Sequence, residues 1–304
     1  MNATGGGDPV FIGGAGRSGI QAVARLVGTH RRYHYLDAQV RFHVDEGGLP
    51  DLLAGAVDLP RFLERMRGYW WFHTRARERE SSGLHQLLGR IDFDRATAEF
   101  ESSFARDPDA AAGQLVRALL DPLARAAGAE SWVEWSTRSV AVAPTLVRLF
   151  PDCKVVHVVR DGRDVACSLA SLPWGPDSVD VAVAVWQRMV AAAEAGLREL
   201  PPGRGMTLYI ADLAIDDRER TYDRLLEFLE LDDDAGIREH FENKLLPGAA
   251  NPGRWEIDLA PTEQRELARA YDKVLDGLRA GGAAIADELA RRAGEPAVTP
   301  GEPA

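Results

Sequence analysis

Residues 11–21 read FIGGAGRSGIQ, an apolar run that ends in glycines and passes into residues spaced as in a helix. The run predicts a buried strand, and the apolar positions from Ile20 to Val27 predict the helix after it. A glycine-rich turn between a strand and a helix favours phosphate, because its amide N–H groups and the helix dipole point at one spot. The stretch therefore predicts an anion site near the start of the chain.

The glycines fit three phosphate-binding patterns, of which the first is the loop that holds ATP or GTP. Such a loop needs Lys and then Ser or Thr directly after its last glycine. This chain has Ile20 and Gln21 there, so it lacks both the lysine for the terminal phosphates and the hydroxyl for magnesium. The sequence disfavours an ATP or GTP loop.

The second pattern is the dinucleotide fingerprint, which the spacing of Gly14, Gly16 and Gly19 satisfies. Asp37 follows where a ribose-binding acid belongs. A dinucleotide domain continues with strand–helix units at short intervals, however, whereas a long and largely helical stretch follows here. An NAD(P)-binding oxidoreductase is therefore kept only as a remote alternative.

The third pattern is the RSG sequence at 17–19, which at the mouth of a helix suggests a pocket for a sulfated nucleotide and demands a second anion site elsewhere. The stretch KVVHVVRDGRDVACSL at 154–169 supplies one. Its strand delivers Arg160 at the carboxyl end, and Ser168 on the next helix faces back toward that end. The competing interpretation is that Arg160 and Arg163 only pair with the neighbouring aspartates.

Strands alternate with helices along the rest of the chain. This order predicts an α/β, P-loop-like three-layer fold with a mostly parallel sheet flanked by helices. We expect one domain over 9–293, with a helical insertion at 50–126 that caps the active-site edge of the sheet. The Gly/Pro-rich ends, 1–8 and 294–304, are expected to be disordered tails.

Composition narrows the function classes. The chain has 304 residues, of which 45% are hydrophobic, and a net charge of -11. This charge argues against non-specific binding to nucleic acid or anionic membranes. The sequence has no apolar stretch of the ~18 residues that span a bilayer and no signal peptide, so a cytoplasmic protein is expected. Cys153 and Cys167 are interpreted as reduced core thiols, and no metal signature is present.

Taken together, the motifs resemble the sulfotransferases that use 3′-phosphoadenosine 5′-phosphosulfate (PAPS), in particular the bacterial sulfotransferase-3 and tyrosylprotein-sulfotransferase-like members. FIGGAGRSG is similar to the family's first motif and VVRDGRDVACSL to its second. LYIADL and NPGRWE resemble later segments in the same order, so the likeness covers about residues 8–275. The resemblance implies PAPS or its product PAP as co-substrate and no metal.

The resemblance also implies roles for individual residues. The loop Gly16, Arg17, Ser18, Gly19, Ile20 and Gln21 would hold the 5′-phosphosulfate. The 3′-phosphate would lie against Arg160 and Ser168. Arg254 and Trp255 are candidates for a segment that closes over the nucleotide, and Trp255 is equally a candidate packing residue.

The sequence departs from the family pattern at its chemical positions. Relatives usually carry two threonines where this chain has Ile20 and Gln21. Gln39 stands at the position of the glutamate base, although Arg41 is kept, and Trp135 replaces a lysine near the bridging oxygen. Glutamine cannot take up a proton, and tryptophan cannot neutralise the leaving oxyanion with a charge.

Two functional hypotheses follow. In the first, the protein is an active sulfotransferase whose acceptor is a hydroxyl or amine of a small molecule, as in bacterial secondary metabolism. The base would be His43, Asp37 or Asp45. The cation that neutralises the leaving group would be Arg17 or Arg41. In the second, the fold no longer transfers sulfonyl groups. The protein would then act on a sulfonated intermediate with sulfate as leaving group, or as a partner subunit of an active homologue in a homo- or hetero-dimer.

Overall fold

A five-stranded sheet forms the centre of the molecule, and its strands lie in the order β2-β5-β1-β6-β7 with every pairing parallel. The computed structural model describes residues 7–75, 80–246, 248 and 250–294. A separate antiparallel hairpin pairs β3 with β4. The strands are β1 (Val10–Gly13), β2 (Tyr33–Tyr35), β3 (His73–Arg75), β4 (Glu80–Ser82), β5 (Ser131–Trp135), β6 (Lys154–Val159) and β7 (Gly205–Tyr209).

Helices follow nearly every strand. The α-helices are α1 (Ile20–Val27), α2 (Leu49–Leu53), α3 (Leu59–Arg65), α4 (Arg90–Ser103), α5 (Pro108–Ala126), α6 (Ala143–Leu149), α7 (Gly162–Ala170), α8 (Val179–Arg198), α9 (Arg218–Leu229), α10 (Ala235–Asn243), α11 (Arg254–Asp258), α12 (Pro261–Ala280) and α13 (Ala286–Gly294). The described residues also form two π-helices, η1 (Met66–Trp70) and η3 (Asp212–Asp216), and a 3-10 helix, η2 (Leu84–Gln86).

Strand β1 is the central strand, as its short apolar sequence predicts for a strand covered on both faces. All four of its residues are buried, and it pairs with β5 on one side and β6 on the other. In this register Ile12 lies beside Trp135, and Gly13 lies beside His157. The carboxyl ends of β1, β5 and β6 therefore meet at one edge of the sheet.

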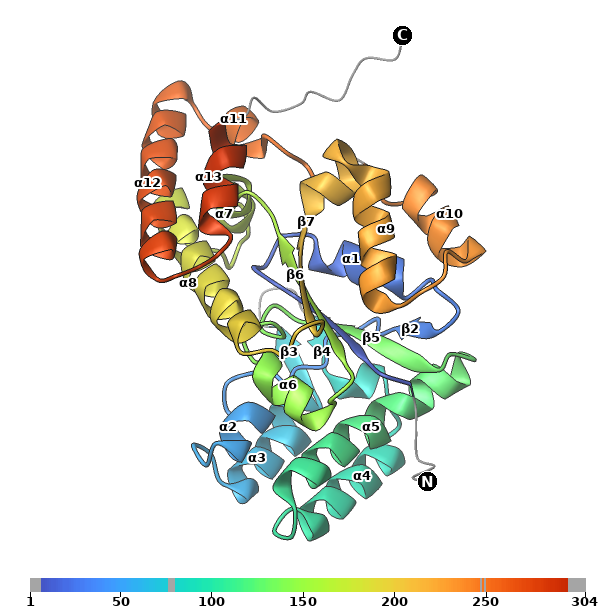
Figure 1. The fold of residues 1–304 in the computed structure, drawn as a ribbon. Coiled ribbons are helices and arrows are strands. Elements are labelled where there is room, and N and C mark those ends of the chain that lie inside the picture. Colours follow the sequence, from blue (N-terminus) through green and yellow to red (C-terminus); the bar gives the residue numbers. More distant parts are fainter. Residues whose placement is uncertain (1–6, 76–79, 247, 249, 295–304) are drawn as a thin grey trace.

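The sheet lies between two layers of helices (Figure 1), and a hydrophobic cluster fills the space on each of its faces. On one face Phe11, Trp132 and Val155 pack with apolar side chains of α4, α5 and α6. On the other face Ile12 and Val156 pack with α1, α9 and α10. A third cluster joins α7, α8, α12 and α13 beyond the strand ends. This arrangement confirms the predicted α/β fold of a mostly parallel sheet between helical layers.

The segment 50–126 differs from the expected cap over the strand ends. It is largely helical, as predicted, but it also contains the β3–β4 hairpin, which the sequence did not suggest. Its helices α4 and α5 pack on a face of the sheet, because their buried side chains belong to the same cluster as Phe11 and Trp132. The segment contacts the stretch after β2 through Tyr69 and Trp70, which hydrogen-bond to Arg41 and Asp45, and through Arg65, which donates to the Glu46 carbonyl.

The structure describes only residues 7–8 and 294 of the two expected terminal tails. Residues 1–6 and 295–304 lie outside the described residues. Gly7 is held beside β5, because its amide donates to the Glu130 carbonyl at 2.7 Å, and Gly294 ends α13.

Both cysteines are free and buried, as the sequence predicts. Burial raises the pKa of Cys153 to about 12 and that of Cys167 to about 11. Both thiols are therefore protonated near neutral pH and pack as small apolar groups.

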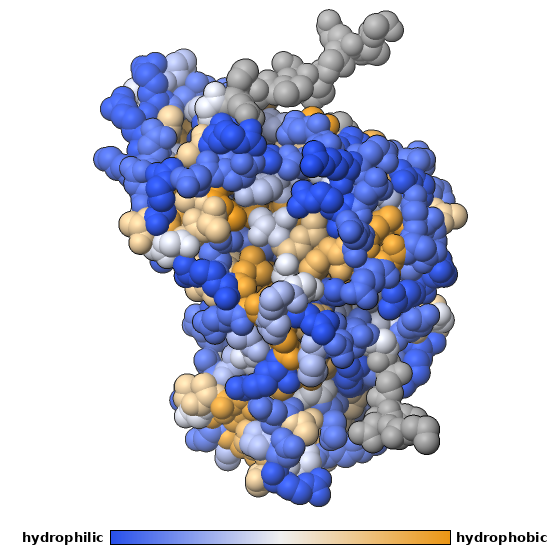
Figure 2. All heavy atoms as spheres, in the orientation of Figure 1, coloured by the Kyte–Doolittle hydropathy of each residue, from blue (hydrophilic) through white to orange (hydrophobic). Residues whose placement is uncertain are grey.

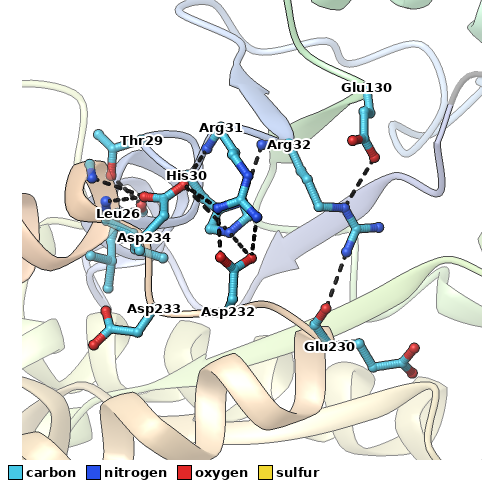
Figure 3. Close-up of polar contacts among 12 residues, drawn as sticks. Leu26, Thr29, His30, Arg31, Arg32, Glu130, Glu230, Asp232, Asp233 and Asp234 are labelled. Carbon is cyan, nitrogen blue, oxygen red and sulfur yellow. Dashed lines mark hydrogen bonds and ion pairs between the residues drawn. The ribbon is translucent and has the colours of Figure 1, made fainter.

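A polar cluster ties the turn between α1 and β2 to the turn between α9 and α10 (Figure 3). Arg31 donates to both carboxylate oxygens of Asp232, at 2.6 and 2.8 Å. The buried His30 accepts from the Arg32 amide through Nδ1, so its Nε2 carries the proton that faces Asp232 at 3.3 Å. This cluster fixes the start of β2, at the end of the sheet opposite to the turn after β1.

The surface is mostly hydrophilic on the face drawn in Figure 2, with hydrophobic side chains gathered toward its middle. Among the helices of the described residues, none combines the length and the apolar character that a membrane span requires.

The turn after β1 supplies a stability prediction, because Gly14 has a φ of 144° and a Cβ added there would lie 2.3 Å from the Val158 carbonyl oxygen. We expect Gly14→Ala to lower the free energy of unfolding by at least about 2 kcal/mol. Gly16→Ala is the matched control, since its Cβ would meet the Thr137 methyl group at an ordinary 3.7 Å. Urea unfolding measures both variants, and equal stability of the two would contradict the prediction.

Candidate functional site

A cavity of about 1050 Å³ lies at the strand-end edge of the sheet. It is bounded by the turn after β1, the segment after β2, the turn after β5 and the segment after β6. Most of the residues predicted from the sequence meet there: Gly16, Arg17, Gly19, Ile20, Gln21, Gln39, Arg41, Arg160, Ser168 and Arg254.

The loop before α1 has the geometry of an anion cradle. Arg17 and Gly19 both have left-handed backbones, with φ of 72° and 91°, and Gly19 forms the N-cap of α1. The first amide groups of a helix have no partner within the helix, and they carry its positive dipole end. The loop therefore presents backbone N–H groups to the cavity, as the glycines predict.

Ser18 does not take the position expected of it. Its side chain is fully buried, and it is not among the residues that line the cavity. Its amide donates to the Ala15 carbonyl, and its hydroxyl has no partner among the described residues. In this conformation Ser18 packs inside the protein, and the neighbouring Arg17 and Gly19 line the cavity instead.

The two predicted anion motifs touch each other directly. Arg17 donates from Nε to the Ser168 hydroxyl at 2.9 Å, across 151 positions of sequence. Arg160 donates to the carbonyl of Arg17 at 3.1 Å and to that of Asn251 at 2.7 Å. Three polar residues, one directly after β6, one in α7 and one in the loop before α1, thus converge on one place in the cavity.

A competing interpretation is that Arg160 and Arg163 only pair with the neighbouring aspartates. The structure agrees with this interpretation for Arg163 and not for Arg160. Arg163 pairs closely with Asp161, at 2.6 Å. Arg160 approaches Asp164 only at 3.7 Å, and its Nε is buried without a partner among the described residues. Arg160 is therefore the arginine that keeps hydrogen-bonding capacity for a ligand.

Asp164 holds the segment that carries Arg254 and Trp255. Its carboxylate accepts from the amides of Gly253, at 3.2 Å, and Trp255, at 3.1 Å. Arg254 lines the cavity, where it pairs with Asp258 at 2.6 Å. The Trp255 ring instead lines a second cavity, of about 760 Å³, with the Arg163 guanidinium 4.4 Å from its centre. Of the two residues expected to close over the nucleotide, only Arg254 lies in the larger cavity.

The segment after β2 places one carboxylate in the cavity lining. The Asp45 carboxylate forms an ion pair with Arg41 Nε at 3.0 Å and accepts a hydrogen bond from the Trp70 indole at 3.3 Å. Arg41 also donates to the Tyr69 hydroxyl, and Gln39 lines the cavity nearby. Asp45 is thus the proposed base that the fold brings to the cavity.

The other two proposed bases lie elsewhere. His43 is fully buried in the core, where its Nε2 faces the buried Glu134 carboxylate at 3.2 Å. Asp37 is exposed and is not among the residues that line the cavity. A turn over residues 41–45, in which the Asp45 amide donates to the Arg41 carbonyl at 2.8 Å, explains the outcome. Phe42 and His43 are buried within the turn, while Arg41 and Asp45 line the cavity.

Trp135, at the position of the missing lysine, is held by two contacts, one with Tyr35 of β2 and one with Leu36 directly after it. Its indole donates to the Leu36 carbonyl at 2.9 Å, and its ring stacks on Tyr35 with 5° between the planes. The Tyr35 hydroxyl in turn accepts from Gln21 at 3.0 Å. Two of the departures from the family pattern, Gln21 and Trp135, are therefore parts of one packed unit.

Several lining residues went unnoticed in the sequence. Arg138 follows Trp135 on the turn after β5, and Trp174 and Met189 come from the α7–α8 connection and α8. The arginine in WSTRS was a readable signal, since it stands directly after a predicted strand. The contribution of α8 carried no signal, because its spacing is that of any amphipathic helix.

The charge of the cavity opposes that of the chain. Among the described residues, its lining has five arginines and one aspartate, whereas the whole chain carries a net charge of -11. Arginine side chains gathered in a concave site select anionic ligands. No group of three or more His, Cys, Asp or Glu side chains in the described part of the chain is arranged to hold a metal ion.

Asp164 gives the site a pH-dependent contribution to stability. Burial, and then the nearby Asp161, raise the pKa of Asp164 to about 6. The folded protein therefore keeps a proton that the unfolded chain releases near pH 4, and stability from this group is lost as pH rises through about 6. We expect the free energy of unfolding of Asp164→Asn to fall less between pH 4 and pH 6 than that of the wild type.

Urea titrations across this pH range test the prediction. Asp94→Asn, on the exposed face of α4, controls for the loss of one carboxylate. Parallel pH profiles for the wild type and Asp164→Asn would contradict it.

Comparison with known proteins agrees with this geometry. The sequence matches the sulfotransferase family over residues 9–235. None of the curated proteins matches it significantly.

Solved structures give a second comparison. The sulfotransferase domain of the olefin synthase from Synechococcus PCC 7002 superimposes with a TM-score of 0.51 at 16% identity, over 89% of this chain and 96% of that one. The sulfotransferase domain from the curacin biosynthetic pathway gives 0.49 at 15% identity, over 86% and 96%. A sulfotransferase from Mycobacterium avium gives 0.47 at 14% identity, over 88% and 76%. At these identities the likeness to solved structures concerns the fold alone. The match to the family spans well over half of the sequence, and the chain therefore belongs to the sulfotransferase family.

Proposed function

We propose that this protein transfers a sulfo group from PAPS to a hydroxyl or amine of a small molecule. The observation that carries the proposal is the convergence of Arg17, Ser168 and Arg160 on one place beside the anion-binding loop. A nucleotide with phosphate groups at both ends of its ribose needs two anion sites in one cavity, and the loop before α1 and the Arg160–Ser168 motif are our candidates for the two.

In this proposal, the amides of the loop before α1 hold the 5′-phosphosulfate, and Arg160 with Ser168 holds the 3′-phosphate. Arg160 also lines the second cavity, where Trp255 lies. The adenosine is then able to extend from the larger cavity along Arg160 toward that tryptophan.

The reaction is an in-line displacement at sulfur, analogous to phosphoryl transfer. The acceptor oxygen forms the new S–O bond while the bond from sulfur to the bisphosphate breaks. Asp45 takes the proton of the acceptor, and Arg17 neutralises charge on the departing phosphate. Asp45 thus does the work that Gln39 cannot do.

The second hypothesis, a fold that no longer transfers sulfonyl groups, is favoured by one observation. Trp135 is fixed by Leu36 and Tyr35, so the turn after β5 offers no ammonium group to the bridging oxygen. Such a protein binds nucleotide or a sulfonated intermediate without transfer, alone or as the partner subunit of an active homologue. The dinucleotide alternative loses support, because Asp37 lies outside the cavity lining.

Calorimetric titration with adenosine 3′,5′-bisphosphate, without magnesium, tests the nucleotide site. We expect the wild type to bind it, and Arg160→Ala to bind it at least about tenfold more weakly, because a charge-assisted contact to phosphate is lost. Arg148→Ala, whose arginine pairs with Asp109 and does not line either cavity, should bind as the wild type does.

NAD and ATP serve as competing ligands in the same titrations. Binding of NAD alone, or equal binding of the bisphosphate by the wild type and Arg160→Ala, would contradict the proposed nucleotide site.

Asp45→Asn tests the base. We expect kcat for transfer from PAPS to a phenol to fall at least about 100-fold, because the acceptor proton loses its destination, while bisphosphate affinity stays unchanged. Asp94→Asn is again the matched control. If the wild type binds the bisphosphate tightly but transfers no sulfo group to any acceptor tested, the non-transferring alternative is favoured.

A further inference from the structure

The part of the larger cavity away from the phosphate loop has a charge arrangement that PAPS does not explain. It is formed by the segment after β2, the turn after β5 and the apolar side chains of α7, α8 and their connection. Two arginines line it, Arg41 and Arg138, and Asp45 is the carboxylate among its described lining residues. This acceptor half therefore carries one cation in excess.

The excess cation is Arg138. Arg41 is matched by the Asp45 carboxylate at 3.0 Å, and the exposed fraction of that carboxylate is only 12%. Arg138 pairs with Glu46 at 3.0 Å, but 84% of the Glu46 side chain is exposed. An ion pair with so exposed a partner contributes little to stability. An anion in the cavity can therefore replace Glu46 as the partner of Arg138.

Arg138 is held on a rigid turn. The buried carboxylate of Glu134 accepts from the hydroxyls of Ser136 and Ser139, on either side of the arginine's own position. Arg138 Nε also donates to the Val44 carbonyl at 3.1 Å. The guanidinium is thus positioned before any ligand arrives, and this lowers the entropy cost of binding.

The cavity also has apolar side chains in its lining. Leu169, Trp174, Val185 and Met189 contribute to it, and 56% of the Trp174 surface is exposed. A large exposed aromatic side chain at the rim of a cavity suits an apolar ligand surface.

We propose that the acceptor is amphipathic: an apolar or aromatic body that carries the accepting hydroxyl and, at a distance from it, a carboxylate or other anionic group that binds Arg138. The inference rests on the proposed function for the identity of the reaction. Its own content is that the acceptor half prefers an acid to the matching neutral molecule.

Calorimetry with para-hydroxyphenylacetate and its methyl ester tests this preference, with and without saturating adenosine 3′,5′-bisphosphate. We expect the wild type to bind the acid about tenfold more tightly than the ester, since one charge-assisted hydrogen bond distinguishes them. Arg138→Gln should abolish the preference by weakening the acid alone. Glu46→Gln should enlarge it, because the carboxylate that competes for Arg138 is gone.

Matched variants separate this result from other causes. Arg148→Gln should keep the preference, and so should Arg160→Ala, in which only bisphosphate binding is expected to fall. Equal binding of acid and ester by the wild type, or a preference that survives in Arg138→Gln, would overturn the inference. A wild type that prefers the acid but does not bind the bisphosphate would contradict the proposed function and leave this inference standing. If Arg138→Gln does not fold, Arg138→Lys and Glu46→Gln test the inference instead. The ratio of acid affinity to ester affinity is then expected to change in opposite directions in these two variants.

Discussion

The contact between Arg17 and Ser168 is the interaction on which the site depends. Neither residue lies in the sheet, yet both positions follow from it, because β1 and β6 are parallel neighbours and Gly13 lies beside His157. Parallel pairing brings the turn after β1 and the helix after β6 to the same edge. Arg160 then joins the two motifs through the carbonyl of Arg17. Any change that shifts the register of β1 against β6 separates the two anion motifs.

Much of this could be read from the sequence, for a physical reason. A buried parallel strand is a short apolar run, and its phosphate-binding turn needs glycines, so both leave local signals that do not depend on distant residues. The places of Arg17, Arg160 and Ser168 relative to strand ends therefore predict one site, and the structure brings these three residues into contact. Arg163 and Asp161 also followed local rules, since they pair with each other within one turn.

What could not be read depended on contacts between distant segments. The direction of His43 follows from Glu134, about ninety positions away, and no local pattern tells a buried histidine from a catalytic one. The same holds for the segment 50–126, whose helical periodicity reveals an apolar stripe but not which face of the sheet it covers. Arg138 is an intermediate case, because its place after β5 was readable, while its weak partner Glu46 was not.

The packing of Gln21, Tyr35 and Trp135 makes these three side chains depend on one another. Tyr35 contacts both of the other side chains, so a change at any one of them alters the surroundings of the rest. A lysine at position 135 would leave the Tyr35 ring without its stacking partner and the Leu36 carbonyl without its donor. A single return to the usual family residue at this position is therefore expected to lower stability. Substitutions among the three positions are expected to change stability non-additively, because they share Tyr35 as a contact.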